Sequence, residues 1–243
     1  MLGGPIQITN ADIRENTTTK HHPIGTLGVT TDGRSFRYAF AGASDLVAGN
    51  LQVAADPVAN HQNRLIDDVV TAPAIGDKKV TLLSIGATAL TADQYADGYL
   101  NVRDNTGEGY LYQIEGHSAY ASAATDVVVF LKDPIEVALD STTEVSLEYN
   151  PWDNVVISAT DQADLPVGIA HAATTLSQFG WVQTHGLASA FCDETFASGG
   201  DLTIGTGAAG QVELLDAAGE PHLGVAHRAG IADEYIQIFL QVD

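Results

Sequence analysis

The sequence predicts an all-β protein built from short strands, arranged as β-sandwich or barrel domains with at most one or two short helices. Its apolar residues come in short runs bounded by Gly, Asn, Asp and Pro, and a helical period of apolar residues is hard to find. Glycine is frequent, with 24 residues in a chain of 243. Because this punctuation continues along most of the chain, we expect many strands joined by turns.

The expected strands follow one another from residue 25 to residue 241. Turn residues separate them, as in the segments 31–33, 104–107 and 216–219, which each end in glycine. The expected strands are residues 25–30, 35–40, 51–54, 79–84, 98–101, 109–115, 126–131, 144–149, 155–157, 167–171, 179–184, 202–204, 212–215 and 235–241. Only residues 57–68 and 91–96 have helical character, and both segments are short.

Residues 1–22 are polar, rich in Thr and sparsely apolar, which predicts an extended N-terminal arm. Such a segment buries too little apolar surface to fold alone, so a partner surface is expected to order it. Its candidate interface residues are Ile6, Ile8 and Ile13. We expect these isoleucines to be the buried side of the arm when it adds as a strand to a neighbouring chain.

The rest of the chain is expected to form two β regions. Residues 23–150 are interpreted as a β domain that carries an inserted β module at about 70–150. Residues 151–243 form a C-terminal region of short strands rich in Gly and Ala, which we expect to pack with residues 23–60. The boundary lies near Tyr149, Asn150 and Pro151.

A short internal echo occurs within the C-terminal region. Val167-Gly-Ile-Ala-His171, followed by an aromatic segment from Phe179, resembles Leu223-Gly-Val-Ala-His227, followed by one from Tyr235. Each copy has the pattern of a strand, a turn of small residues and a second strand. Duplicated β-hairpin units would explain the echo.

The chain is strongly acidic, with 31 Asp and Glu against 10 Lys and Arg and a formal net charge of −21. This charge opposes binding to phosphate backbones, so nucleic acid is not an expected partner. It is explained either by solubility, including in a salty habitat, or by steering towards a basic patch on a partner. Apolar runs are too short to span a bilayer and the N-terminus lacks the pattern of a Sec-type signal, so no membrane association is expected.

The motifs that could carry chemistry do not predict a catalytic, cofactor or metal site. Gly205-Thr-Gly-Ala-Ala-Gly210 fits the dinucleotide-binding pattern, but Gln211–Leu215 alternates like a strand instead of a helix, which predicts a glycine turn between strands. The eight histidines lack a two-ligand spacing and are expected mostly at the surface or in turns, with a paired structural role for His171 and His227. A shared proton-sensing role of these two histidines is a further alternative.

The single cysteine, Cys192, excludes an internal disulfide. It lies beside Asp193 and Glu194, whose carboxylates oppose a thiolate, so Cys192 is expected to be a buried small side chain and not a nucleophile. Elbow, zinc-binding and phosphate-loop motifs of known enzymes do not occur in the sequence. The protein is therefore not expected to be an enzyme.

Two stretches resemble the capsid decoration (cement) proteins of tailed bacteriophages and related small virion proteins. The first is Gly33-Arg-Ser-Phe-Arg-Tyr-Ala-Phe-Ala-Gly-Ala-Ser-Asp-Leu-Val-Ala-Gly-Asn-Leu51. The second runs from Val167-Gly-Ile-Ala-His171 through Gly180-Trp-Val-Gln-Thr-His-Gly186 and Gly200-Asp-Leu202 to Leu223-Gly-Val-Ala-His227 and Tyr235-Ile-Gln237. The resemblance covers about 100 residues and excludes residues 70–150.

The resemblance implies a protein on the outer surface of a capsid, with the major capsid protein as its partner and a homotrimer as its oligomeric state. Its expected function is to stabilise the shell by bridging capsid subunits. One alternative is a tail, baseplate or neck protein. Another is a carbohydrate-binding module on the virion, with sugars stacking on Trp152, Trp181, Tyr95, Tyr99, Tyr110 and Tyr120.

Overall fold

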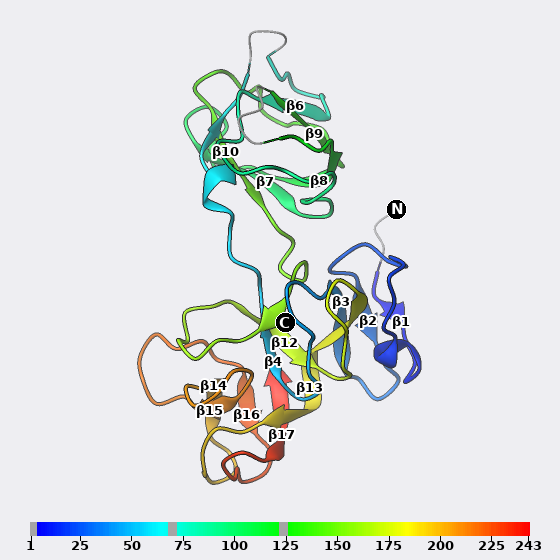
Figure 1. Cartoon of the computed structure of the whole chain (residues 1–243), viewed down its shortest axis with the longest axis vertical. Coiled ribbons are helices and arrows are strands. Elements are labelled where there is room, and N and C mark those ends of the chain that lie inside the picture. The colour runs from blue at the N-terminus through cyan, green and yellow to red at the C-terminus, as the bar shows by residue number, and fades with distance from the viewer. Residues whose placement is uncertain (1–3, 68–71, 122–125) are drawn as a thin grey trace. The chain divides into compact units, whose positions relative to one another are not determined.

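The computed structural model describes residues 4–67, 72–121 and 126–243 (Figure 1). It confirms the all-β class, because the regular secondary structure of the described residues consists of strands apart from two 3₁₀ helices, η1 (Asp12–Arg14) and η2 (Ala59–His61). The helix expected at 57–68 is limited to η2, and the segment 91–96 forms turns. Left-handed backbone at Asn63 and Asp93, with φ of 53° and 54°, stops helical propagation in both places. No helix in the described ranges is long and apolar enough to cross a membrane.

The chain divides into two compact units. Unit 1 consists of Met1–Ala55 and Pro151–Asp243, and unit 2 consists of Asp56–Asn150. Unit 2 is an insertion in unit 1, and it begins earlier than the position near residue 70 that the sequence suggested. The difference arises because η2 and the two-residue strand β5 (Arg64–Leu65) belong to unit 2 and are too short to have a recognisable apolar period.

Unit 2 is a six-stranded antiparallel sheet with the order β5-β10-β7-β8-β9-β6. Hydrogen bonds from the Asp67 amide to the Thr81 carbonyl, 2.9 Å, and from the Leu83 amide to the Leu65 carbonyl, 2.9 Å, join its two edge strands. The sheet therefore nearly closes into a barrel around a single apolar core. Besides β5, its strands are β6 (Lys79–Leu82), β7 (Tyr99–Asp104), β8 (Leu111–His117), β9 (Val127–Leu131) and β10 (Glu144–Glu148).

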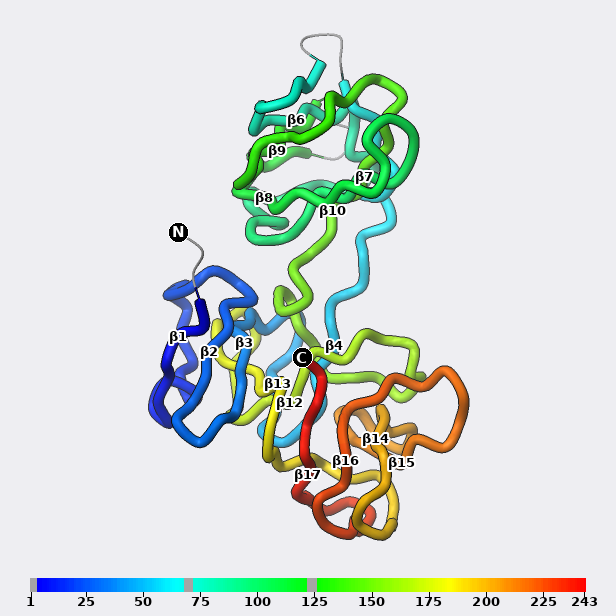
Figure 2. The backbone as a smooth tube through the Cα atoms, turned by 180° about the vertical axis from the view of Figure 1, so that it is seen from behind, coloured from blue at the N-terminus to red at the C-terminus, as the bar shows by residue number. Residues whose placement is uncertain are grey.

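Unit 1 is built on one sheet of eleven strands. Its main path has the order β1-β2-β3-β13-β17-β16-β14-β15, and β12 joins β13 to β4, which in turn pairs with β11. The tube in Figure 2 shows the last strand, β17 (red), beside β13 (yellow). The strands are β1 (Ile6–Gln7), β2 (Leu27–Val29), β3 (Ser35–Phe40), β4 (Leu51–Val53), β11 (Val156–Ile157), β12 (Pro166–Ala170), β13 (Phe179–Phe191), β14 (Asp201–Ile204), β15 (Val212–Leu214), β16 (Gly224–Ala226) and β17 (Tyr235–Gln241).

The sheet of unit 1 contains two copies of one five-stranded arrangement. In the first copy, repeat A, neighbouring strands pair in the order β3-β13-β12-β4-β11; in the second, repeat B, they pair in the order β13-β17-β16-β14-β15. The repeats share β13, whose residues 179–184 belong to repeat A and whose residues 185–191 belong to repeat B. The internal echo of the sequence therefore marks a duplicated β unit.

The registers of the two repeats agree residue by residue. Ile169 pairs with Gln183 and Leu51 in repeat A, and Val225 pairs with Phe239 and Asp201 in repeat B. Isolated bridges match in the same way: Leu46 with Thr174 corresponds to Phe196 with Gly230, and Ala41 with Val155 corresponds to Cys192 with Val212. Such agreement identifies the two copies as one repeated fold.

A glycine lies at the same position of the echo in both repeats, for the same steric reason. Gly168 has φ of 135° and Gly224 has φ of 146°. A Cβ on Gly168 would lie 2.2 Å from the Gln183 carbonyl oxygen, and a Cβ on Gly224 would lie 2.1 Å from that of Phe239. Both glycines let β12 and β16 approach the neighbouring strand at a conformation that other residues rarely adopt.

The repeats differ in the connection between their fourth and fifth strands. In repeat A, unit 2 lies between β4 and β11, whereas in repeat B the residues 205–211 join β14 to β15 directly. This loop contains the Gly205-Thr-Gly-Ala-Ala-Gly210 motif, and the strands on either side of it are antiparallel. The motif is therefore a turn between strands, as the sequence predicted.

Strand β13 is longer than the sequence suggested, because it continues past Gly186 to Phe191. The register shifts between Gln183 and His185, and Gly186 has φ of 91°. This bulge bends the strand without ending it, which allows one strand to serve both repeats.

Candidate binding surface

The outer face of repeat B is formed by alternate residues of β13 and β17. Leu187 pairs with Phe239, Ser189 with Gln237, and Phe191 with Tyr235. The residues between them, such as Ala188, Ile236 and Ile238, point to the opposite side and pack in the core of unit 1. We call the set Leu187, Ser189, Phe191, Tyr235, Gln237 and Phe239 the open face.

The open face is largely apolar, five of its six residues are exposed, and none of them carries a charge. Leu187, Tyr235 and Phe239 retain 43%, 54% and 42% of their accessible surface. The rings of Phe191 and Tyr235 stack at 5.1 Å, and His185 meets the Phe239 ring edge-on at 5.3 Å. In a chain with net charge −21, an uncharged group of exposed aromatic side chains indicates an interaction surface.

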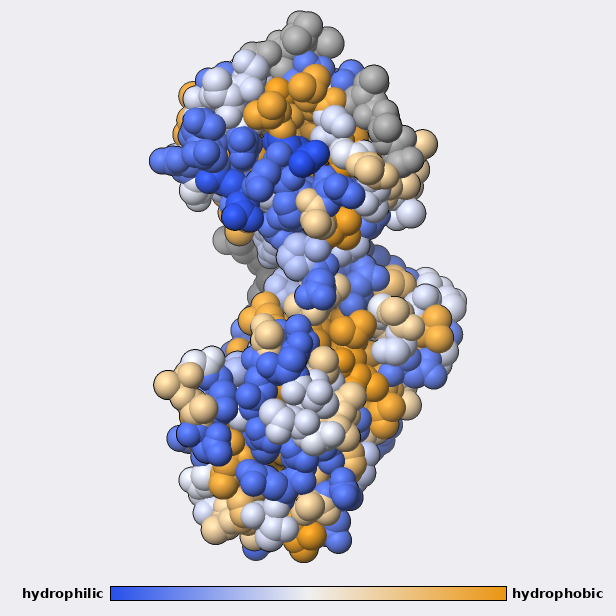
Figure 3. Space-filling view, turned by 60° about the vertical axis from the view of Figure 1, so that its left-hand side comes forward, coloured by the Kyte–Doolittle hydropathy of each residue, from blue (hydrophilic) through white to orange (hydrophobic). Residues whose placement is uncertain are grey.

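Two hollows adjoin the open face. The first, of about 310 Å³, lies between the repeats and is lined by Ala48, Gly49, Ile169, Ala170, His171, Gln183, Ser189 and Tyr235. The second, of about 440 Å³, is lined by Asp32, Gly33, Arg34, His185, Gly186, Leu187 and Phe239. The open face is thus bordered by depressions that can receive side chains of a bound partner. Figure 3 shows hydrophobic residues reaching the surface of each unit among hydrophilic ones.

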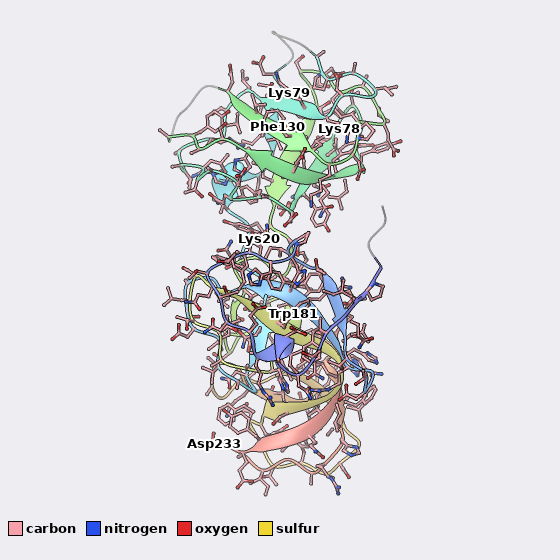
Figure 4. All side chains as sticks on the ribbon, turned by 90° about the vertical axis from the view of Figure 1, so that its right-hand side faces the viewer. Lys20, Lys78, Lys79, Phe130, Trp181 and Asp233 are labelled. Carbon is pink, nitrogen blue, oxygen red and sulfur yellow. The ribbon has the colours of Figure 1, made fainter. Side chains whose placement is uncertain are left out.

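The equivalent face of repeat A is covered by the chain's own N-terminal segment, residues 4–24. The registers match Leu187 to Phe36, Ser189 to Tyr38, Phe191 to Phe40, Tyr235 to Phe179, Gln237 to Trp181 and Phe239 to Gln183. In repeat A these positions, apart from Gln183, belong to one apolar cluster with residues of the N-terminal segment, in which Phe36, Tyr38 and Trp181 are buried and Phe40 and Phe179 are half-buried. Figure 4 shows Trp181 inside unit 1, and it is 2% exposed.

The three isoleucines predicted as an interface with a neighbouring chain lie in this cluster. Ile8 and Ile13 are 4% and 1% exposed, and the half-buried Ile6 packs against the same cluster. Ile6 also lies in β1, which pairs with β2 of the same chain. The expectation of strand addition to a neighbour is therefore corrected: the large aromatic side chains of β3 and β13 offer the arm an apolar surface within its own chain.

Two of the eight histidines lie in the interior of unit 2, whereas the other six are exposed or half-buried, in agreement with the surface or turn positions expected for most of them. His61 is fully buried, with its Nδ1 2.7 Å from the Tyr95 hydroxyl and its Nε2 3.2 Å from the Thr88 carbonyl oxygen. His117 is 4% exposed and accepts a hydrogen bond from the Tyr95 amide at Nε2, 3.1 Å. Burial lowers the pKa of both histidines, so each is held in its neutral form.

Other candidates from the sequence are accounted for by packing. Cys192 is fully buried, as predicted, and burial raises the pKa of its thiol. Trp181 and Tyr95 are also buried and cannot stack on a sugar, which removes two of the aromatic residues considered for carbohydrate binding. Within the described residues, no three His, Cys, Asp or Glu side chains gather as metal ligands.

Sequence reasoning missed the open face, although one signal for it was available. The segment Tyr235–Gln241 alternates strictly, with Ile236, Ile238 and Leu240 on one side. Tyr235 and Phe239 lie on the other side with Gln237 and Gln241, where a solvated strand usually has only polar residues. Aromatic residues on the polar side of an amphipathic strand are typical of a binding surface.

Comparison with known proteins adds no family to this description. No family model matches the sequence, no curated protein is significantly similar to it, and no solved structure matches its fold significantly.

Proposed function

We propose that this chain is a structural protein of a virus particle, which binds the outer surface of a tailed-phage capsid and stabilises the shell by bridging capsid subunits. The observation that carries the proposal is the open face, where the exposed, uncharged side chains of Leu187, Tyr235 and Phe239 lie with the half-buried Phe191 on a strongly acidic chain. The resemblance of the stretches from Gly33 and Val167 to decoration proteins supports the same function.

The mechanism of this function is mechanical. Packaged DNA presses capsid subunits apart, and a protein that contacts several subunits resists that pressure by burying apolar surface between them. Burial of apolar surface contributes about 25 cal/mol per Å² before the cost of association. Because many copies act on one shell, small contributions from each copy add to a large effect on the particle.

Co-sedimentation with particles that lack the protein tests this proposal. We expect the wild-type chain to pellet with such particles at a fixed ratio to the major capsid protein and to raise their resistance to heat. The mass of the free protein in solution checks the proposed homotrimer. A chain that stays in the supernatant would contradict the function, and a few copies per particle would assign it to the tail, baseplate or neck.

A matched pair of variants locates the contact. Phe239→Ser changes a ring that is 42% exposed on the open face, and Phe130→Ser changes a ring that is 45% exposed on β9 of unit 2 (Figure 4). We expect Phe239→Ser to lose co-sedimentation and Phe130→Ser to retain it. The opposite result would move the contact to unit 2.

A further inference from the structure

The outer face of repeat A has two parts, and each part is covered in a different way. The part on β12 and β4 carries Ile169 and Leu51, which pack into the core of repeat B. The part on β3 and β13 carries Phe36, Tyr38 and Trp181, which the N-terminal segment covers.

The part of repeat B on β16 and β14 is polar and solvated, so it needs no covering segment. Asp201 lies where repeat A has Leu51, and its carboxylate is 3.3 Å from Nε2 of His222. Its side chain is 62% exposed. A charged, solvated residue at this position stops a further repeat from stacking on repeat B, as polar terminal repeats do in repeat proteins.

The part of repeat B on β13 and β17, the open face, is largely apolar, like the equivalent part of repeat A. It is the equivalent of the surface that the N-terminal segment covers in repeat A. The missing cover is therefore an extended segment of chain and not a third repeat.

The N-terminal segment shows how such a cover binds. It crosses the face as an open chain that contains β1 and the single turn of η1, places Ile8 and Ile13 on the aromatic side chains, and exchanges two backbone hydrogen bonds between Thr17 and Phe179, of 3.1 and 2.7 Å. The His21 amide donates to the Tyr38 hydroxyl, 3.0 Å. Branched apolar side chains and a few backbone contacts are thus sufficient to cover this type of face.

Charge restricts the partner that supplies the segment. The chain's own N-terminal segment is used on repeat A, and a second copy carries the same charge of −21. Exposed carboxylates of Asp233 and Glu234 directly precede Tyr235, and in one of the adjoining hollows Asp32 and Arg34 form an ion pair, 2.9 Å. The backbone amide of Arg228 donates to the Gln237 carbonyl, 3.2 Å, so one basic residue also lies near this face. This balance favours a partner segment with basic residues.

From this comparison we infer that the open face binds an extended segment of a partner protein, with branched apolar side chains and flanking Lys or Arg residues. The segment lies across β13 and β17 as the N-terminal segment lies across β3 and β13. The identity of the partner as a capsid protein rests on the proposed function, but the chemistry of the segment does not.

Selection from a random peptide library tests the inference without any virus particle. Displayed peptides of about a dozen residues are selected on the full-length chain. We expect a consensus with two or three Ile, Val or Leu at spaced positions and at least one Lys or Arg. Affinity for the consensus peptide should fall at least about tenfold in Leu187→Ser and in Phe239→Ser, and should be unchanged in Phe130→Ser.

Two results would overturn the inference. One is a selection that yields no binder or only acidic peptides, and the other is a binder whose affinity is the same for the wild type and for Leu187→Ser and Phe239→Ser. Tryptophan fluorescence verifies that Leu187→Ser and Phe239→Ser fold, because Trp152 and Trp181 both belong to unit 1, and tyrosine circular dichroism verifies the same for Phe130→Ser in unit 2. Co-sedimentation of the chain with particles but no peptide binding would reject this inference and leave the proposed function intact. Peptide binding without co-sedimentation would support this inference and contradict the proposed function.

Discussion

Repeats A and B share strand order, register and the glycine of the echo, but they use the same face in different ways. Phe36, Tyr38 and Trp181 of repeat A are core residues because the N-terminal segment lies on them. Leu187, Ser189 and Gln237 occupy the equivalent positions of repeat B and are solvated. The role of a position in a duplicated fold therefore depends on what covers it as well as on its place in the sheet.

The connection between the fourth and fifth strands is a second difference. The antiparallel pairing of Val53 with Val156 in repeat A corresponds to that of Thr203 with Glu213 in repeat B. Because the strand ends lie side by side in both repeats, the connection can be a short loop or a whole domain without disturbing the sheet. Unit 2 occupies a position where insertion is tolerated.

The largest expected effect is a difference in the free energy of unfolding between variants of the two outer faces. Phe36→Ala removes a fully buried ring and is expected to lower the free energy of unfolding of unit 1 by about 3–5 kcal/mol. Leu187→Ala, at the equivalent exposed position, is expected to change it by less than about 0.5 kcal/mol. Denaturant unfolding followed by tryptophan fluorescence measures both. Similar losses in the two variants would contradict the difference between the faces.

The glycine of the echo tests the likeness of the repeats. Gly168→Ala and Gly224→Ala each place a Cβ within 2.2 Å of a carbonyl oxygen at positive φ, so each is expected to cost about 2 kcal/mol or more. Gly219→Ala is the control, because its φ of 100° is also positive but no atom lies within 4 Å of the added Cβ. We expect a loss of about 1 kcal/mol there. If only one of the two echo glycines were sensitive, the repeats would not be equivalent.

Acid is expected to lower the stability of the inserted unit 2 more than that of unit 1, which contains the repeats. The pKa of His61 and of His117 lies below the unfolded value of about 6.5, so the folded state binds fewer protons than the unfolded state. The stability of unit 2 is therefore complete above pH of about 6.5 and falls below it, by up to about 1.4 kcal/mol per pH unit for each histidine. The charged groups that act on this pair are Arg64 and Asp93.

The aromatic residues allow the two units to be followed separately in this experiment. Six of the eight tyrosines and neither tryptophan belong to unit 2. At pH 5 the melting temperature of unit 2, followed by the tyrosine signal in near-ultraviolet circular dichroism, should be lower than at pH 7. The melting temperature of unit 1, followed by tryptophan fluorescence, should change less. A unit 2 that is equally stable at both pH values would exclude buried neutral histidines.

The smallest effect is expected from removing the insertion. Replacing residues 56–150 by the loop 205–211 gives repeat A the connection of repeat B. We expect unit 1 to remain folded, with a change of less than about 1 kcal/mol in its stability, because no strand of its sheet is removed. Loss of the cooperative tryptophan transition would mean that unit 1 depends on unit 2.

Sequence patterns predicted the class and most strands of this fold, since alternation and turn residues are local properties. The shortest strands, β1 and β5, have too few residues for a pattern. The destination of the N-terminal segment could not be predicted, because Ile8 and Ile13 fit any apolar surface and only the fold brings Trp181 beneath them. The open face was missed for a related reason, because alternation does not reveal which face is covered.

Hydroxyl-radical footprinting of the free and particle-bound chain tests the account most directly. In the free chain we expect oxidation of Tyr235 and Phe239 and protection of Tyr38 and Trp181, although an exposed tryptophan would be the most reactive of these side chains. On the particle, Tyr235 and Phe239 should become protected as well. Oxidation of Trp181 in the free chain, or unchanged oxidation of Tyr235 and Phe239 on the particle, would contradict the account.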